Sequence, residues 1–207
     1  MRVLVMGAAG QTGRLVVDEL VALGHEVRGM VRSTEQFDAL TAAGAEPVQG
    51  DLLDDYTGAL DGVDAVVFCA GAPLGGDPEV IDRDACIAAQ ASAQAAGVKR
   101  WVQLSSLMAD RPEQGPPFLL KFLQAKGASD AALADSELDW TVVRPGGLQD
   151  APATGLVSLG TGLASGGLPR GDVAAVLAAS VAADNTIGKA FDLMGGQTPV
   201  ADAVASI

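Results

Sequence analysis

The sequence predicts a single α/β domain of the Rossmann type, a doubly wound parallel sheet with a small C-terminal lobe. Three observations predict it: short apolar runs alternate with helical patterns as far as Pro145, a glycine-rich loop follows the first apolar run, and the 207 residues fit one domain. Aromatic residues make up only 4% of the chain, so Ala, Val and Leu must form most of the core, which suits parallel strands covered on both faces. We expect residues 1–145 to form the Rossmann core and residues 146–207 to complete the same domain.

The strands and helices expected before Pro145 end where the spacing of apolar residues changes or where a glycine follows. The apolar run at 3–6 is typical of a buried strand. Val16, Leu20 and Leu23 then follow the spacing of one helix face, and Gly24 is suited to end that helix. Further strands are expected at 26–31, 46–49, 64–69, 100–105 and 140–144, with helices at 37–43, 80–96 and 118–136.

The pattern becomes less regular after Pro145. Residues 151–169 are rich in Gly, Ser, Thr and Pro, and a short strand is expected at 156–159. A clear helical pattern covers 172–183, and we expect Asp172 to be its N-cap, because a short acidic side chain can accept a hydrogen bond from the first turn. We expect this lobe to lie over the carboxyl edge of the sheet, where the parallel strands end. It closes with a strand at 191–194 and a helix at 199–206.

Charge and cysteine content exclude several classes of function. The net charge of -13 opposes phosphate-rich partners, so we expect no nucleic-acid partner and no docking on an anionic membrane. No apolar run approaches the roughly 20 residues that span a bilayer, and the sequence starts on a strand without a secretion signal, which predicts a cytoplasmic protein. Cys69, Cys86 and the single histidine, His25, are not spaced for a zinc site, and we expect no metal. A monomer and a homodimer are both compatible with the sequence.

The glycine-rich loop at 7–13 reads Gly-Ala-Ala-Gly-Gln-Thr-Gly, directly between the first strand and the first helix. Its glycines permit a tight turn, a close approach of the backbone to a ligand, and close packing of helix on strand. Unpaired N–H groups and the positive end of the helix dipole favour an anion there. We therefore expect the loop to hold the pyrophosphate of a dinucleotide, the alternative being a tight turn without a ligand. The expected contacts are Gly7, Ala9, Gly10, Gln11, Thr12 and Gly13.

The end of the second strand predicts which dinucleotide binds. Sites that prefer NAD place an acidic residue there, on the ribose 2'-hydroxyl, but this chain has Val31 followed by Arg32 and Ser33. A guanidinium and a hydroxyl suit the 2'-phosphate of NADP(H), so we expect NADP as the cofactor. Arg28 is a weaker candidate for the same role, and the alternative for Arg32 is a surface charge.

The ends of the third and fourth strands supply further expected contacts. Asp51 and Leu52 come just after the third strand and are expected beside the adenine. Cys69, Ala70 and Gly71 come at the end of the fourth strand and are expected to contact the cofactor as well.

Three segments together resemble the atypical short-chain dehydrogenase/reductase family, in particular its NAD(P)H-binding NmrA-like and biliverdin reductase B-like members. The segments are GAAGQTGRLVVDELVALGHEVRGMVR at 7–32, the Gly50-Asp51-Leu52 step, and LDWTVVRPGGL at 138–148. The likeness covers nearly the whole chain. It implies a Rossmann fold and NAD(P)H binding, and it is much less specific for an activity.

In that family a tyrosine and a lysine four residues later act on substrate and cofactor. The matching lysine is Lys126, but Phe122 occupies the tyrosine position and has no hydroxyl to donate a proton. The single tyrosine, Tyr56, is distant in sequence, so tyrosine-dependent acid–base chemistry is not expected. The resemblance implies that Lys126 binds the nicotinamide-ribose hydroxyls; the alternative is a solvated lysine on a helix.

The resemblance also implies a serine at the end of the strand 101–104. Ser106 is the first candidate and Ser105 the second, because either hydroxyl could bind a substrate carbonyl. The alternative is a serine that satisfies backbone groups at a strand end. The loop expected beside the nicotinamide consists of Pro145, Gly146, Gly147 and Leu148.

Two functions of different classes remain open from the sequence. The first is an NADPH-dependent reductase that passes a hydride directly to a small acceptor such as a flavin, a quinone or a tetrapyrrole-like compound, since the cofactor carries the chemistry. The second is a non-catalytic NADP(H) sensor of the NmrA type with a protein partner, which the loss of the tyrosine at Phe122 would permit. A nucleotide-sugar epimerase is a third hypothesis, which the missing tyrosine and the short C-terminal region disfavour.

Overall fold

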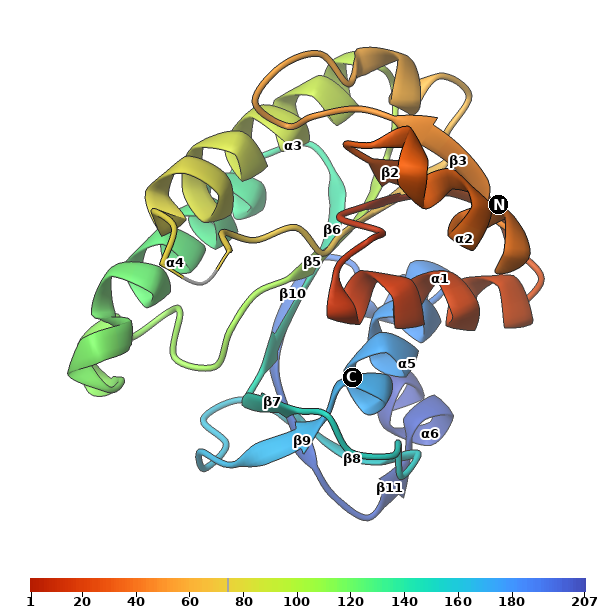
Figure 1. Cartoon of the computed structure of the whole chain (residues 1–207). Coiled ribbons are helices and arrows are strands. Elements are labelled where there is room, and N and C mark those ends of the chain that lie inside the picture. Colours follow the sequence, from red (N-terminus) through yellow and green to blue (C-terminus); the bar gives the residue numbers. More distant parts are fainter. Residues whose placement is uncertain (74) are drawn as a thin grey trace.

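The structure is a computed structural model that describes residues 1–73 and 75–207. It confirms an α/β Rossmann-like fold with a mostly parallel sheet (Figure 1). The strands are β1 (Arg2–Met6), β2 (Glu26–Val31), β3 (Glu46–Gln49), β4 (Ala65–Phe68), β5 (Arg100–Leu104), β6 (Asp139–Pro145), β7 (Gly147–Gln149), β8 (Leu156–Gly160), β9 (Gly167–Pro169), β10 (Lys189–Gly195) and β11 (Thr198–Pro199). The helices are α1 (Gln11–Ala22), α2 (Phe37–Ala42), α3 (Cys86–Ala95), α4 (Leu120–Ala134), α5 (Arg170–Val181) and α6 (Val200–Ala205), with a π-helix, η3, over Glu79–Ala85.

The main sheet has nine strands in the order β11-β8-β10-β6-β5-β4-β1-β2-β3. The strands from β3 to β10 in this order pair in parallel, and β8 pairs antiparallel with both β10 and β11. The order of the chain reverses on either side of β1, whose neighbours are β2 and β4. In open α/β sheets ligands bind outside the carboxyl ends of the strands at this point.

Helices cover both faces of the sheet, as the alternation of buried side chains in β1 requires. Val3 and Val5 pack in the core on the face covered by α1 and α5, whereas Leu4 and Met6 pack in the core on the face covered by α3 and α4. Figure 1 shows the two helical layers on opposite sides of the sheet. Small and β-branched side chains fill both cores, with Trp101 the largest fully buried side chain. None of the helices in the described residues is long and apolar enough to span a membrane.

The segment after Pro145 extends the main sheet on one side of β6. Strand β10 continues the parallel order, and β8 and β11 add an antiparallel edge. Strands β7 and β9 pair with each other in a separate two-stranded sheet. The lobe is therefore joined to the Rossmann core by backbone hydrogen bonds and by helix α5, which packs on α1 and on the central strands.

Two expected elements differ in detail. The helix expected at 80–96 is divided into the π-helix Glu79–Ala85 and the α-helix α3. The hydrogen bonds of the first part follow the i→i+5 pattern of a π-helix, and those of α3 follow the α-helical pattern. The N-cap expected at Asp172 is wrong: α5 begins at Arg170 and Pro169 is its N-cap residue. Asp172 is instead fully buried and accepts hydrogen bonds from the hydroxyl and N–H of Thr154, and it thereby fastens the preceding loop to the helix.

Candidate functional site

The glycine loop forms a turn that no other residue type could form without displacement. Gly7 has a φ of +88°, and a Cβ on it would lie 2.7 Å from the backbone nitrogen of Ala70. A Cβ on Gly13 would overlap the carbonyl of Gly7, so glycine there lets α1 begin directly against the turn. Gly10 precedes α1 and no side chain caps the helix, so its first N–H groups are free for an anion.

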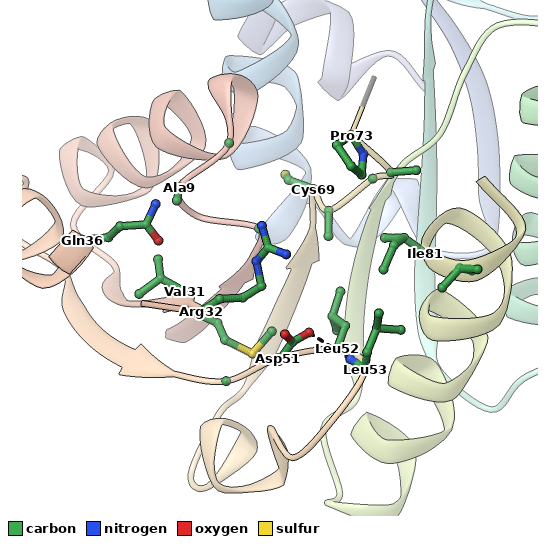
Figure 2. A pocket seen from close by; sticks show the side chains of 18 of the residues that line it. Ala9, Val31, Arg32, Gln36, Asp51, Leu52, Leu53, Cys69, Pro73 and Ile81 are labelled. Atoms are coloured by element: carbon green, nitrogen blue, oxygen red, sulfur yellow. Dashed lines mark hydrogen bonds between the residues drawn. The ribbon is translucent and has the colours of Figure 1, made fainter. Parts of the chain in front are cut away.

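A cavity of about 570 Å³ opens at the carboxyl edge of the sheet beside this loop. Figure 2 shows its lining, with Arg32 on one side and Cys69 and Pro73 on the other. It lies at the reversal of strand order, where open α/β sheets bind their ligands. Nine expected cofactor contacts line it: Gly7, Ala9, Gly10, Arg32, Asp51, Leu52, Cys69, Ala70 and Gly71. Expected contacts outside this lining are Gln11, Thr12 and Gly13 in the first turn of α1, together with Ser33, Lys126 and the loop Pro145, Gly146, Gly147 and Leu148.

The side chain of Arg32 extends into the cavity, between Ala9 and Cys69 in Figure 2. It is exposed, and no hydrogen bond or ion pair to its guanidinium is present within the described residues. Ser33 stands next to it and accepts a hydrogen bond from the N–H of Glu35 at 3.3 Å, which leaves the serine proton free to donate. The cavity lining therefore has a free cation at Arg32, and the next residue along the chain, Ser33, has a hydroxyl free to donate.

Arg28, the weaker candidate, is occupied elsewhere. Its guanidinium pairs with Glu46 at 3.2 Å and donates to the carbonyl oxygens of Ala59 and Asp61. It does not line the cavity. The structure thus leaves Arg32 as the arginine that faces the expected 2'-phosphate position.

Apolar side chains line the cavity near Asp51 and Leu52, where the adenine is expected, and the sequence reasoning missed several of them. Asp51 accepts a hydrogen bond from the N–H of Leu53, which closes the turn after β3. Leu53 is 62% exposed and Val80 is 40% exposed, and both line the cavity. Exposed apolar side chains in a cleft suit contact with a flat aromatic ring. The lining residues that were not expected include Met30, Gln36, Leu53, Pro73, Val80 and Ile81.

The residues that follow β4 form one wall of the cavity, and buried side chains pack against the side of this wall that faces the protein interior. Cys69 is free, and burial raises the pKa of its thiol to about 12 while Lys126 lowers it to a smaller extent, so the thiol is neutral near pH 7. Asp82 accepts a hydrogen bond from the N–H of Ala72 at 3.0 Å. This wall therefore presents backbone groups and a neutral thiol to a ligand.

Lys126 is not a solvated helix lysine, and that alternative is wrong. Its side chain is buried, with Nζ 3.1 Å from Oδ1 of Asp82 and donating to the carbonyl of Leu104 at 3.0 Å. The ammonium lies 5.9 Å from the ring centre of Phe122. Lys126 thus already has an anionic partner. Its binding of the ribose hydroxyls stays a prediction.

A second cavity, of about 660 Å³, lies at the ends of β5 and β6, which are the next strands after β4 along the same edge. Backbone hydrogen bonds fix its loops: the N–H of Leu107 donates to Pro145, and that of Gly147 donates to Gly166. Six of the residues expected beside the substrate and the nicotinamide line it, whereas Lys126 does not; the six are Ser105, Ser106, Pro145, Gly146, Gly147 and Leu148. The rest of its lining is Leu107, Met108, Gln114, Gly115, Pro116, Leu119, Phe122, Leu123, Ser165 and Gly166.

The two serines differ in what their hydroxyls can do. Ser105 is buried and donates to Oδ2 of Asp130 at 2.8 Å. Ser106 is only half-buried, and its hydroxyl has a single long contact of 3.4 Å to the carbonyl of Leu107. Met108 follows with a φ of +69°, a rare conformation for a side chain of its size that occurs most often at functional turns. Ser106 is therefore the serine with a hydroxyl available to a ligand.

A chain of charged side chains lies behind the second cavity, and the sequence reasoning did not find it. Asp130 accepts from Arg144 at 3.0 Å, Arg144 pairs with Asp110, and Arg111 connects Asp110 to Asp192. Burial raises the pKa of Asp130, and Arg144 opposes this rise. No periodic signal could have revealed the chain, because its members come from four separate segments.

Tyr56 is not available as a replacement acid. Its hydroxyl is 3.1 Å from the hydroxyl of Ser92, it is buried beneath α3, and it lines neither cavity. The position of the family's tyrosine is held by Phe122 in the wall of the second cavity.

The comparisons with known proteins show the family to which the chain belongs. The family model described as NAD(P)H-binding matches residues 7–184, and the chain belongs to this family, within the atypical short-chain dehydrogenase/reductase proteins. A protein of Bacillus subtilis named as an uncharacterized sugar epimerase is 38% identical over the whole of both chains. A solved structure of a putative NAD-dependent epimerase/dehydratase from Bacillus halodurans is 38% identical, covers both chains completely and superposes with a TM-score of 0.97.

A named reductase is among the more distant relatives. The (4-alkanoyl-5-oxo-2,5-dihydrofuran-3-yl)methyl phosphate reductase of Streptomyces griseus is 30% identical over 93% of this chain and 67% of its own length. A structure described as a putative NADH-flavin reductase from Streptococcus pneumoniae has a TM-score of 0.76 at 22% identity, covering 94% of this chain and 99% of its own, which shows a shared fold.

Proposed function

We propose that this protein is a reductase that passes a hydride from NADPH directly to a neutral, largely apolar acceptor such as a flavin or quinone ring. The observation that carries the proposal is the second cavity, which lies at the next strand ends along the same sheet edge and has no ionisable side chain in its described lining. Its volume is within the range of sites for small molecules. The named reductase of Streptomyces griseus supports reductase chemistry within the family.

The residues of the first cavity fit NADPH. The uncapped start of α1 and the glycine turn suit the pyrophosphate, and Arg32 with Ser33 suits the 2'-phosphate. When bound, NADPH supplies the hydride. Family membership supports NAD(P)H as a class, and the preference for NADPH is our inference from Arg32.

The second cavity gives the chain three tasks in this reaction. The Ser106 hydroxyl can donate a hydrogen bond to an acceptor carbonyl, whose oxygen gains negative charge as the hydride arrives. Phe122 and Met108 form apolar walls that orient a flat ring and exclude water. The proton that completes the reduction comes from water, so a protein acid at the position of Phe122 is not required.

Epimerisation, which the name of the Bacillus subtilis relative suggests, fits the second cavity less well. That chemistry begins by removing a proton from a sugar hydroxyl, and the described lining provides no ionisable side chain to accept it. The sensor hypothesis would use the first cavity alone. The second cavity, with its lining free of ionisable side chains, favours the reductase over the epimerase and the sensor.

The test is acceptor-dependent NADPH oxidation in a stopped-flow instrument. We expect riboflavin and a short-chain quinone to oxidise NADPH faster than FMN does, because the phosphate of FMN has no cation in the cavity lining. NADH in place of NADPH is the control for the cofactor. Absence of oxidation with every acceptor would reject the reductase, and a preference for FMN would reject the neutral acceptor.

A further inference from the structure

Asp82 and Lys126 form an ion pair inside the protein, behind the wall of the cofactor cavity. Asp82 is 1% exposed and Lys126 is 5% exposed. Oδ1 of Asp82 lies 3.1 Å from Nζ of Lys126 and has no directed hydrogen bond within the described residues, so the contact is a charge pair. Neither side chain lines the cavity itself.

The carboxylate of Asp82 instead contacts the backbone that forms the wall. Its Oδ2 accepts the N–H of Ala72 at 3.0 Å. A Cβ on Gly71 would lie 3.0 Å from Oδ1, so the carboxylate is packed directly against that residue. Gly71 and Ala72 both line the cofactor cavity. Asp82 therefore lies directly behind the cavity wall and holds the backbone that a bound ligand would contact.

The π-helix Glu79–Ala85 explains how one short segment faces two ways. Val80 and Ile81 line the cavity, while the next residue, Asp82, is turned to the interior. π-helical turns are rare, and they are frequently found at functional sites. Here the turn places apolar side chains at the cavity and an anchoring carboxylate behind the wall.

Lys126 supplies the cation that a carboxylate at this depth needs. A carboxylate without a partner is costly to bury, and the ammonium at 3.1 Å offsets that cost. The carbonyl of Leu104 fixes the ammonium on its other side. Lys126 stands on α4, whose residues Phe122 and Leu123 line the second cavity, so the pair connects the walls of the two cavities.

We propose that Asp82 is a positioning residue for the dinucleotide, which it holds through the backbone of Gly71 and Ala72, and that Lys126 acts as its counter-ion. The inference rests on NAD(P)H binding, not on the reductase activity. Cofactor affinity tests it without any acceptor, and its failure is thus distinct from failure of the reductase proposal.

Two double variants that both lack the lysine isolate the anchor. Asp82→Asn with Lys126→Met removes both charges and keeps an amide oxygen for the N–H of Ala72. Asp82→Leu with Lys126→Met removes both charges and the acceptor. We expect the leucine variant to bind NADPH about 5- to 10-fold more weakly than the asparagine variant, in calorimetry well below both melting temperatures, because one backbone donor is then unpaired. Any direct contact of Lys126 with the cofactor cancels in this ratio.

A merely structural pair would lower the melting temperature of the leucine variant and leave the NADPH affinities of the two folded variants equal. Equal affinities would therefore overturn the proposal. If the leucine variant does not fold, Asp82→Ala with Lys126→Met replaces it in the same comparison. Amide hydrogen exchange provides a second measurement: we expect slow exchange at Ala72 in the wild-type chain and in the asparagine variant, and rapid exchange in the wild-type chain would overturn the anchor.

Discussion

The two cavities at the carboxyl edge are built in opposite ways. The cofactor cavity leaves polar groups free, namely the first N–H groups of α1 and the guanidinium of Arg32. The second cavity has its charged groups turned away from it, since Ser105 and Arg144 both bind Asp130 behind the wall. Because free charged and N–H groups bind anions, and satisfied ones do not, the first cavity suits a phosphate-bearing ligand and the second a neutral one.

The largest effect that tests this comparison is expected at the glycine turn. In Gly13→Ala, the new methyl group would overlap the carbonyl of Gly7, so the start of α1 must move away from the pyrophosphate position. We expect NADPH affinity to fall by about 100-fold or more, since the helix terminus can no longer present its N–H groups. Calorimetry measures the affinity. Gly58→Ala is the matched control, because a Cβ there meets no atom within 4 Å, and an equal loss in both variants would contradict the assignment.

Arg32→Ala tests the free cation of the cofactor cavity. The variant should lose about 1.5–3 kcal/mol of NADP+ binding, a loss of roughly 10- to 100-fold, while NAD+ binding changes little, because the 2'-phosphate loses a charge-assisted contact. Parallel titrations with the two dinucleotides give the result. Lys99→Ala removes another exposed cation as a control, and equal losses for NADP+ and NAD+ in Arg32→Ala would place the arginine elsewhere.

Ser106→Ala tests the second cavity. Removing a hydroxyl that stabilises a developing oxyanion should lower kcat by about 10-fold with a smaller change in KM for the acceptor, since the contact strengthens as the hydride is transferred. Steady-state NADPH oxidation with riboflavin separates the two constants. Ser158→Ala makes the same truncation on β8, away from both cavities. A change confined to KM would show that the serine only binds the acceptor.

The smallest effect is expected from the charged groups behind the second cavity. Burial raises the pKa of Asp130 above its ordinary value of 3.8, so the folded chain retains a proton that the unfolded chain has lost. Stability therefore falls as the pH rises above about 3.8 towards the raised pKa, and Asp130→Asn should show a flatter dependence there. Urea unfolding from about pH 4 to pH 7 measures this. Parallel curves for the two proteins would mean that Asp130 does not titrate in this range.

Features that depend on a short stretch of sequence were predictable. The glycine turn, the strand ends at Arg32 and Asp51, and the 145–148 loop all lie at the expected edge, because parallel strands bring their carboxyl ends together. The N-cap at Asp172 was wrong because burial against Thr154 outweighed local capping preference.

The sequence by itself determined the order of strands and helices as far as Pro145 and the phosphate loop, since these follow from local periodicity and glycine geometry, and its resemblance to the family identified the loss of the tyrosine at Phe122. Tertiary structure alone decided that Lys126 pairs with Asp82 and that Ser105 is occupied while Ser106 is free. These partners are distant in the chain, and which of two polar groups is buried and paired depends on packing across the sheet, a property that no short segment encodes.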